Sequence, residues 1–102
     1  MTSPVYAVFE VHIDADAPPE AKQSYDEYRA AVPALIARFG GRYLVRAAVP
    51  ESLEGEPSHG KWHLVEFPDR ESALGFWACD EYRALTPLRA GAAEVRAVLL
   101  GG

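Results

Sequence analysis

Residues 5–13, VYAVFEVHI, are the stretch from which the fold can be worked out. Apolar side chains at the odd positions alternate with a mixed set at the even positions. A period of two in a segment rich in valine and aromatic residues is typical of a β-strand with one apolar face and one mixed face. We therefore expect a strand here, with its odd-numbered side chains directed toward a core.

A long helix is expected after this strand. Pro19 and Glu20 are typical of a first helical turn, and large apolar residues then recur at helical spacing as far as Phe39. Pro33 lies within this apolar stripe and lacks a backbone donor, so we expect a kink or a local break there. Gly40 and the glycine after it end the helix, because glycine takes the left-handed cap conformation without a Cβ clash.

The rest of the chain alternates in the same way. Pro68 and Asp69 stop one strand and cap a helix, and Pro87 interrupts the helix after it. Residues 50–60 are rich in turn formers, although residues 52–54 could add a short strand. The expected elements are strands over residues 5–13, 42–49, 61–67 and 95–100 and helices over residues 19–39, 70–78 and 81–94.

This order, β-α-β-β-α-β, predicts an α+β, ferredoxin-like fold in which two helices cover one face of an antiparallel sheet. The other face would be bare. We expect Arg42, Leu44 and Arg46 on one face of their strand and Tyr43 and Val45 on the other. The bare face would carry Tyr6, Val8, Glu10, Leu44, Trp62 and Leu64. So apolar a set usually marks an interface, and we expect a homodimer that packs two such sheets face to face.

Composition bounds the function. The chain has 102 residues, enough for a single domain over residues 1–102, and a net charge of -5. That charge argues against a nucleic-acid or anionic-membrane partner, both of which call for a basic face. Cys79 is the one cysteine, so it cannot build a cysteine zinc site, and three scattered histidines give no metal-ligand spacing. We expect a mature cytoplasmic protein that uses neither metal nor cofactor.

Several motifs resemble one known family. They are Tyr28-Arg29, Pro33, residues 40–46 (GGRYLVR), residues 66–69 (EFPD), Ala73, Trp77, Glu81-Tyr82 and Arg89. In this order they are similar to the bacterial domain-of-unknown-function-1330 family, from Val5 to Leu100. The resemblance implies a ferredoxin-like monomer and a dimeric α/β-barrel, but no established activity. Related barrels include cofactor-free monooxygenases, lactone isomerases and polyketide cyclases, an analogy at the level of the fold alone.

The sequence departs from that family at three places. Ala47 and Ala48 stand where a pair of glycines is typical, which bears on the local backbone of the second strand. Cys79 replaces a usual serine and Asp80 a usual proline, and both changes concern the helix junction more than any site.

Four ionisable residues are candidates for chemistry. Glu10 and His12 are two apart on one strand, so their side chains share a face and could transfer a proton. Arg46 and Glu66 lie on neighbouring strands, and an ion pair between them could orient a substrate carboxylate or enolate. The alternatives are a wet or interface-paired Glu10 and His12, and a structural salt bridge between Arg46 and Glu66.

Aromatic residues are candidates for binding. Tyr6 and Trp62 would form an apolar wall for a flat ligand, and they are equally expected in a dimer interface. Tyr82 could close one end of a cavity or simply pack in the core. His63 is expected to face the helices as a partly buried structural residue, and His59 to be solvated in its loop.

These residues predict a homodimeric barrel that binds a small organic molecule between sheet and helices and performs cofactor-free acid/base chemistry, of isomerase, cyclase or dehydratase type. Glu10 or His12 would move the proton, and Arg46 would stabilise negative charge. Three alternatives stay open: a non-catalytic metabolite-binding protein, a cofactor-independent monooxygenase, and a structural dimer with a filled interior.

Overall fold

The strand over Val5–Ile13, β1, lies at the centre of a four-stranded antiparallel sheet. It pairs with β3 (Lys61–Phe67) on one side and with β4 (Ala93–Gly101) on the other, and β2 (Arg42–Ala48) pairs with β3. The computed structural model describes residues 3–101, so Met1, Thr2 and Gly102 of the predicted domain lie outside the described residues. The strand order β2-β3-β1-β4 is that of the predicted ferredoxin-like α+β fold.

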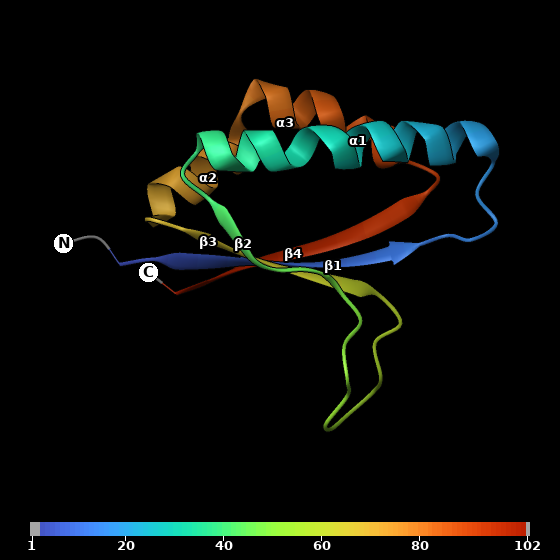
Figure 1. Cartoon of the computed structure of the whole chain (residues 1–102), viewed down its shortest axis with the longest axis horizontal. Coiled ribbons are helices and arrows are strands. Elements are labelled where there is room, and N and C mark those ends of the chain that lie inside the picture. The colour runs from blue at the N-terminus through green and yellow to red at the C-terminus, as the bar shows by residue number, and fades with distance from the viewer. Residues whose placement is uncertain (1–2, 102) are drawn as a thin grey trace.

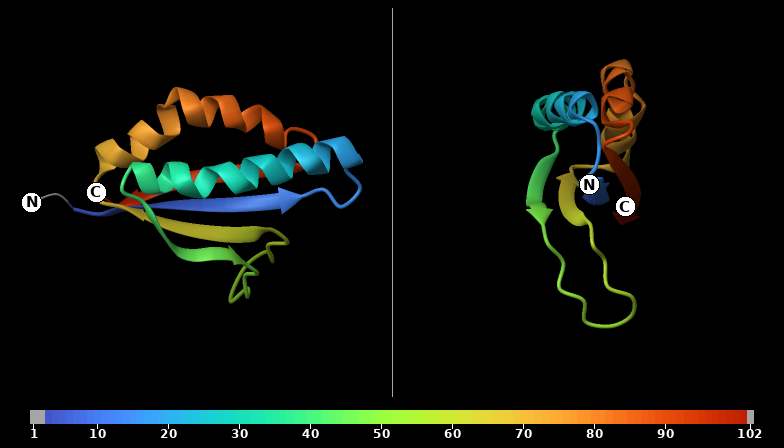
Figure 2. Two further views of the ribbon diagram at one scale, coloured as in Figure 1. Left: turned by 45° about the horizontal axis from the view of Figure 1, so that its top comes forward. Right: turned by 90° about the vertical axis from the view of Figure 1, so that its right-hand side faces the viewer.

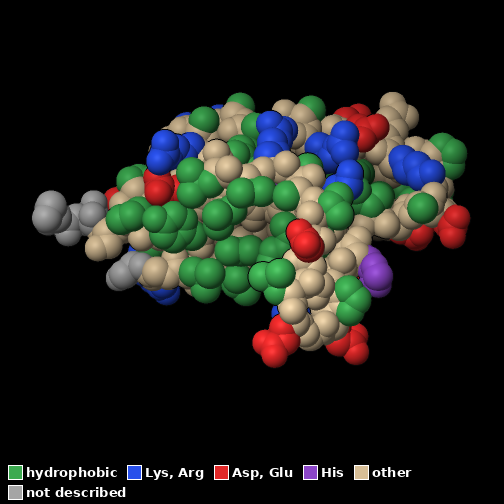
Figure 3. Space-filling model, turned by 60° about the horizontal axis from the view of Figure 1, so that its bottom comes forward, with side chains coloured by type: hydrophobic (Ala, Val, Ile, Leu, Met, Phe, Trp, Pro, Cys, Tyr) green, Lys and Arg blue, Asp and Glu red, His purple; other side chains and the backbone are tan. Residues whose placement is uncertain are grey.

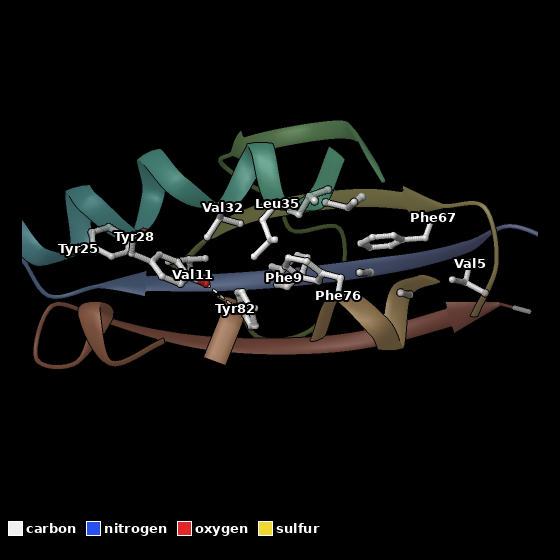
Figure 4. Packing of buried hydrophobic residues seen from close by; sticks show 14 of the residues in the cluster. Val5, Phe9, Val11, Tyr25, Tyr28, Val32, Leu35, Phe67, Phe76 and Tyr82 are labelled. Atoms are coloured by element: carbon white, nitrogen blue, oxygen red, sulfur yellow. Dashed lines mark hydrogen bonds between the residues drawn. The ribbon is translucent and has the colours of Figure 1, made fainter. Parts of the chain in front are cut away.

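The helices all cover one face of this sheet (Figures 1 and 2). They are α1 (Pro19–Arg38), α2 (Arg70–Ala78), α3 (Asp80–Leu85) and a 3₁₀ turn, η1 (Thr86–Arg89). Odd-numbered residues of β1 and β3 pack beneath them, and Val5, Val65 and Phe67 are completely buried. Figure 4 shows this core between sheet and helices. None of the helices in residues 3–101 is long and apolar enough to cross a membrane.

The end of α1 and the start of α2 lie where the sequence predicts, whereas the interior of α1 differs from the prediction at Pro33. α1 continues unbroken through Pro33, so of the two predicted alternatives, a kink or a local break, the break is wrong. Gly40 has a φ of +82° just after the helix, the left-handed conformation expected there. Asp69 caps α2, because its carboxylate accepts a hydrogen bond from the Ser72 backbone N–H at 2.7 Å.

Near the C-terminal end the sequence pattern overestimated helix. In place of the predicted helix over residues 81–94, α3 ends at Leu85, just before the interruption predicted at Pro87, and η1 ends at Arg89. The chain then turns at Gly91, whose φ is +79°. The last strand is correspondingly longer than expected and begins at Ala93. Residues 52–54 form no strand.

Two irregularities in β2 change which way its side chains point. Tyr43 pairs with Val65, but Val45 pairs with Leu64, so Leu44 is an extra residue in the ladder. An extra residue moves the side chains that follow it, as far as the next irregularity, to the opposite face. Val45 therefore joins Leu64 on the bare face, and Arg46 lies on the helix side, where it lines the cavity between sheet and helices. The predicted faces of Val45 and Arg46 are wrong for this reason.

The connection between β2 and β3, residues 49–60, projects away from the helices as an arm (Figures 1 and 2). Leu53 near its tip is 94% exposed and Val49 at its base is 79% exposed. Ser58 anchors the end of the arm that leads into β3. Its hydroxyl donates to Glu10 Oε2 at 2.7 Å and accepts from the Trp62 indole N–H at 3.1 Å. The arm is thus attached to the bare side of β1 and β3.

The bare face is apolar, as predicted (Figure 3). Val98 is 50% exposed and Leu100 54%, and they lie opposite Val8 and Tyr6 across the β1–β4 ladder. Leu44 and Val45 extend the apolar surface at the β2 edge. A patch of this kind on one side of a thin two-layer domain is typical of an interaction surface.

Candidate functional site

A cavity of about 450 Å³ lies between the sheet and the helices. Its floor comes from β1, β3 and the bulged end of β2, and its roof from α1, α2 and α3. Its polar lining includes Tyr28, Tyr43, Arg46, Lys61, His63 and Tyr82. Its apolar wall includes Phe9, Val11, Val32 and Phe76. Such a volume and a mainly apolar wall with a few polar groups are usual for small-molecule sites.

Two tyrosine hydroxyls meet at this cavity. Tyr28 from α1 and Tyr82 from α3 point toward one another, with their hydroxyl oxygens 2.8 Å apart (Figure 4). Nη1 of Arg89, at the end of η1, donates to both oxygens, at 2.9 Å from Tyr28 and 3.0 Å from Tyr82. We call these three residues the tyrosine–arginine cluster. It joins three separate elements and places a guanidinium behind two hydroxyls.

Both hydroxyls of the cluster are inside the fold, since Tyr28 is 9% and Tyr82 1% exposed. Burial, followed by the neighbouring Tyr28 hydroxyl, raises the pKa of Tyr82 well above its usual range. Burial likewise raises the pKa of Tyr43. Tyr82 and Tyr43 are therefore protonated near neutral pH and act as hydrogen-bond donors rather than as bases.

A backbone N–H at the second irregularity of β2 determines which ring nitrogen of His63 carries the proton. The backbone N–H of Ala47 donates to His63 Nδ1 at 3.1 Å. In the neutral ring the proton is therefore on Nε2, which leaves His63 with a donor and no free lone pair. Burial, and then the charge of Arg46, lowers the pKa of His63, which favours this neutral form.

Charge around the cavity is opposite in sign to that of the whole chain. Three of the ten Lys and Arg residues line it, against one of the fifteen Asp and Glu residues. That one, Asp26, is 3.7 Å from Arg29 in an exposed pair. Arg46 lies over the Tyr43 ring at 4.9 Å, a cation–π contact. The cavity is thus rich in cations and hydrogen-bond donors.

The structure divides the predicted site residues between the two faces of the sheet. Arg46 and Tyr82 line the cavity described above. Glu10, His12 and Trp62 instead line a second, more open pocket of about 670 Å³ on the bare face, together with Ser58 and other residues at the arm's base. Within one subunit, Glu10 and His12 are therefore not brought together with Arg46, because the sheet separates them.

The ion pair predicted between Arg46 and Glu66 is replaced by one between Arg42 and Glu66. Glu66 accepts from Arg42 Nε at 3.0 Å on the bare face, and the bulge at Leu44 has turned Arg46 away from it. Tyr6 lies on the bare face too, opposite Leu100. The predicted pairing of Arg46 with Glu66 is wrong, and its physical reason is the extra residue in β2.

On the bare face Glu10 has structural partners. Its carboxylate accepts from Ser58, lies 3.3 Å from His12 Nε2 and lies 3.7 Å from Arg96. The Ser58 hydrogen bond, with the His12 and Arg96 charges, lowers the pKa of Glu10 despite partial desolvation. An ionised carboxylate that holds the arm in place is the role this geometry describes.

Tyr28 and His63, which line the cavity, and Arg89, which lies behind Tyr28 and Tyr82, were not singled out as site residues from the sequence. Tyr28 was assigned to the apolar stripe of α1, Arg89 only to the family resemblance, and His63 to a structural role. A tyrosine in an apolar stripe is a usable signal, because a buried hydroxyl needs a partner. Nothing in the sequence shows that the partner is Arg89, 61 residues away.

Among residues 3–101, no group of three His, Cys, Asp or Glu residues is arranged to hold a metal ion. Cys79 is a free, half-buried thiol whose sulfur accepts from the Tyr82 backbone N–H. Its place is the cap of α3.

Solved structures with this fold are numerous, and their sequences have diverged widely. A protein of unknown function from Rhodopseudomonas palustris is 19% identical, with a TM-score of 0.76 over 98% of this chain and 82% of its own. A dimeric ferredoxin-like protein of unknown function from Jannaschia sp. CCS1 is 11% identical, with a TM-score of 0.68 over 98% of this chain and 100% of its own. SnoaB, a cofactor-independent oxygenase from Streptomyces nogalater, is 13% identical, with a TM-score of 0.58 over 99% and 94%.

At such identities these likenesses establish the fold alone. No curated protein matches the chain. A family described as a domain of unknown function (DUF1330) matches residues 4–102, nearly the whole sequence, as the motifs predicted. The chain belongs to the DUF1330 family.

Proposed function

We propose that this protein is a homodimer that binds a small, partly apolar organic molecule in the cavity between its sheet and helices. The observation that carries the proposal is the cavity itself, about 450 Å³ with an apolar wall and polar groups from three sides. Arg46, Tyr28 and Tyr82 line the cavity and would be the polar partners of a bound molecule.

The dimer is proposed to form through the bare face of the sheet. Val98 and Leu100 are half exposed there, and the solved neighbour from Jannaschia is described as dimeric. A second copy would cover this apolar surface and also the base of the arm, where Glu10 and Ser58 lie. Glu10, His12, Tyr6 and Trp62 then belong to the interface rather than to the ligand.

Binding, and polarisation of a bound oxygen, suit the cavity better than proton abstraction. Most of its polar side chains donate: His63 carries its proton on Nε2, Tyr43 and Tyr82 are phenols, and Arg46 is a cation. The lining carboxylate, Asp26, is paired with Arg29 at the surface. Donors aimed at one oxygen stabilise negative charge that develops on it. Stabilisation of an enolate or alkoxide oxygen is the part of isomerase, cyclase or dehydratase chemistry that these donors would supply.

Cofactor-independent oxygenation is the second candidate. SnoaB, described as an oxygenase of this kind, has a related fold, and aromatic side chains such as Phe9, Tyr43 and Phe76 line the cavity here. Such chemistry needs an electron-rich aromatic substrate, so oxygen consumption on addition of a bound phenol separates it from plain binding.

Native mass spectrometry of gently purified protein tests the proposal, because one spectrum reports both subunit number and any retained molecule. We expect a dimer with a defined extra mass. The variant Val95→Phe, which narrows the cavity from β4, should lose that mass, whereas Leu99→Phe on the same strand face, outside the cavity, should keep it. A monomer, or a mass kept equally by both variants, would contradict the proposal.

A further inference from the structure

Counting hydrogens in the tyrosine–arginine cluster shows one donor left over. Arg89 Nη1 has two N–H groups, and each hydroxyl of Tyr28 and Tyr82 has one O–H, which makes four hydrogens. The cluster contains three hydrogen bonds, from Arg89 to each oxygen and between the two oxygens. Three hydrogens are used, so one hydroxyl hydrogen has no acceptor inside the cluster.

That spare hydrogen belongs to a hydroxyl at the cavity. Tyr28 and Tyr82 both line it, and Arg89, which does not, holds the oxygens from behind. A buried donor without an acceptor is costly, so the arrangement is complete only when an acceptor atom sits in the cavity. Arg89 donates directly to both hydroxyl oxygens, and its positive charge makes a negatively charged oxygen the preferred acceptor of the spare hydrogen.

Other charged and polar groups around the cavity agree with this preference. Arg46 and Lys61 are cations on its sheet side, and His63 is a neutral donor beside them. The carboxylate among the lining residues, Asp26, is paired with Arg29. The apolar wall between these groups requires a hydrophobic body, and Phe9 and Phe76 belong to it.

We infer that the tyrosine–arginine cluster is an oxyanion-binding subsite, and that the ligand is an aromatic or similarly apolar molecule bearing a carboxylate, phenolate or enolate oxygen. This inference rests on the proposed function, because it assigns the ligand class for the same cavity. The spare Tyr28 or Tyr82 hydroxyl donates to the oxygen, and Arg89 balances its charge through the two hydroxyls.

Two naphthalene probes of similar shape test the charge preference. Binding of 2-naphthoate and of 2-methylnaphthalene is followed by their fluorescence at pH 8. We expect 2-naphthoate to bind at least about tenfold more tightly, the effect of one charge-assisted hydrogen bond after desolvation. Arg89→Met should abolish this preference while 2-methylnaphthalene still binds, and Arg89→Lys should restore part of it.

Arg38→Met is the matched control. Arg38 pairs with Glu81 on the surface, so this variant loses the same charge away from the cavity and should keep the wild-type preference. A second measurement needs no variant at position 89. Protein labelled with ¹³C at the tyrosine Cζ should show shifts at Tyr28 and Tyr82 with 2-naphthoate that 2-methylnaphthalene does not produce, with resonances assigned through Tyr28→Phe and Tyr82→Phe.

The outcomes separate the two claims. Equal affinity for the two probes, or equal Cζ shifts, would overturn the oxyanion subsite and leave the cavity as a site for neutral apolar ligands. Binding of neither probe would overturn the proposed function and this inference with it. A preference retained by Arg89→Met and lost in Arg38→Met would place the anion site elsewhere and also overturn the inference.

Discussion

At the scale of single residues, His63 shows how one backbone hydrogen bond decides what a side chain can do. The Ala47 N–H occupies Nδ1, so protonation of the ring would set two N–H groups against each other. The pKa of His63 is lowered in the folded protein, whereas in the unfolded chain it is about 6.5. The contribution of His63 to the free energy of unfolding is therefore fully present above pH 6.5. It is lost as the pH falls below that value, because the unfolded chain takes up the proton first.

We therefore expect the free energy of unfolding to fall between pH 7.5 and 5.5, and His63→Gln to fall less. Glutamine keeps an acceptor for Ala47 and has no proton to gain. Urea denaturation at the two pH values measures the difference. His59→Gln, on the exposed arm, is the control and should behave as wild type. Equal pH dependence in wild type and His63→Gln would contradict the assignment.

Residue types were more predictable than their partners. The sequence placed Tyr28 on a buried helix stripe and His63 on the helix side of its strand, both correctly. It could not pair Tyr28 with Arg89, because that contact depends on how α1 and η1 meet across the sheet. The roles of Glu10, His12, Tyr6 and Trp62 stay predictions, now directed toward the interface.

At the scale of elements, β2 carries the main departure from the sequence pattern. Ala47 has a φ of +52°, in the left-handed region, at the second irregularity of the strand. This is one of the two positions where the family resemblance led us to expect glycine. An alanine there is strained by roughly 1 kcal/mol, which glycine would not be.

Ala47→Gly should therefore raise the free energy of unfolding by about 0.5–1 kcal/mol. Ala48 is the matched control, since it pairs regularly with Trp62 and should lose about that amount when replaced by glycine. Thermal and urea unfolding of the two variants measure the expected rise in unfolding free energy for Ala47→Gly and the expected fall for Ala48→Gly. Destabilisation of similar size at both positions would show that Ala47 is not strained.

Strands and helices with a sustained period were predictable, because burial of one face imposes that period on the sequence. The bulge at Leu44 was not, since an inserted residue leaves local composition unchanged while it reverses the faces of Val45 and Arg46. The helix expected over residues 81–94 failed for a related reason. Apolar spacing persists there, but Pro87 and Gly91 convert its second half into η1 and a turn.

At the scale of the whole molecule, the helices cover one face of the sheet and leave the other bare (Figure 2), which is where we propose that a second copy binds. Val98→Arg would bury an unpaired charge in the proposed interface and should weaken dimerisation at least about a hundredfold. Leu74→Arg is the matched control, since Leu74 is 45% exposed on α2, in the helix layer, against 50% for Val98. Sedimentation velocity over a concentration series gives the dissociation constants.

A Val98→Arg protein that stays as dimeric as wild type would contradict an interface on the bare face. If Leu74→Arg dissociates instead, the helices form the interface. The apolar even-numbered positions of β1 and its neighbours are the sequence feature that predicts a dimer. What the sequence could not show is that the arm's base shares that surface with Glu10 and Ser58.

The pairing of β1 with β4 also has a consequence for synthesis on the ribosome. Residues 5–13 are made early, yet their partners along one entire edge are residues 93–101. Until β4 emerges, the central strand of the sheet is left with an open edge, and Val5, Phe9 and Val11 lack part of their cover. The nascent chain therefore carries an aggregation-prone strand edge from the synthesis of β1 until β4 has been made and has paired with it.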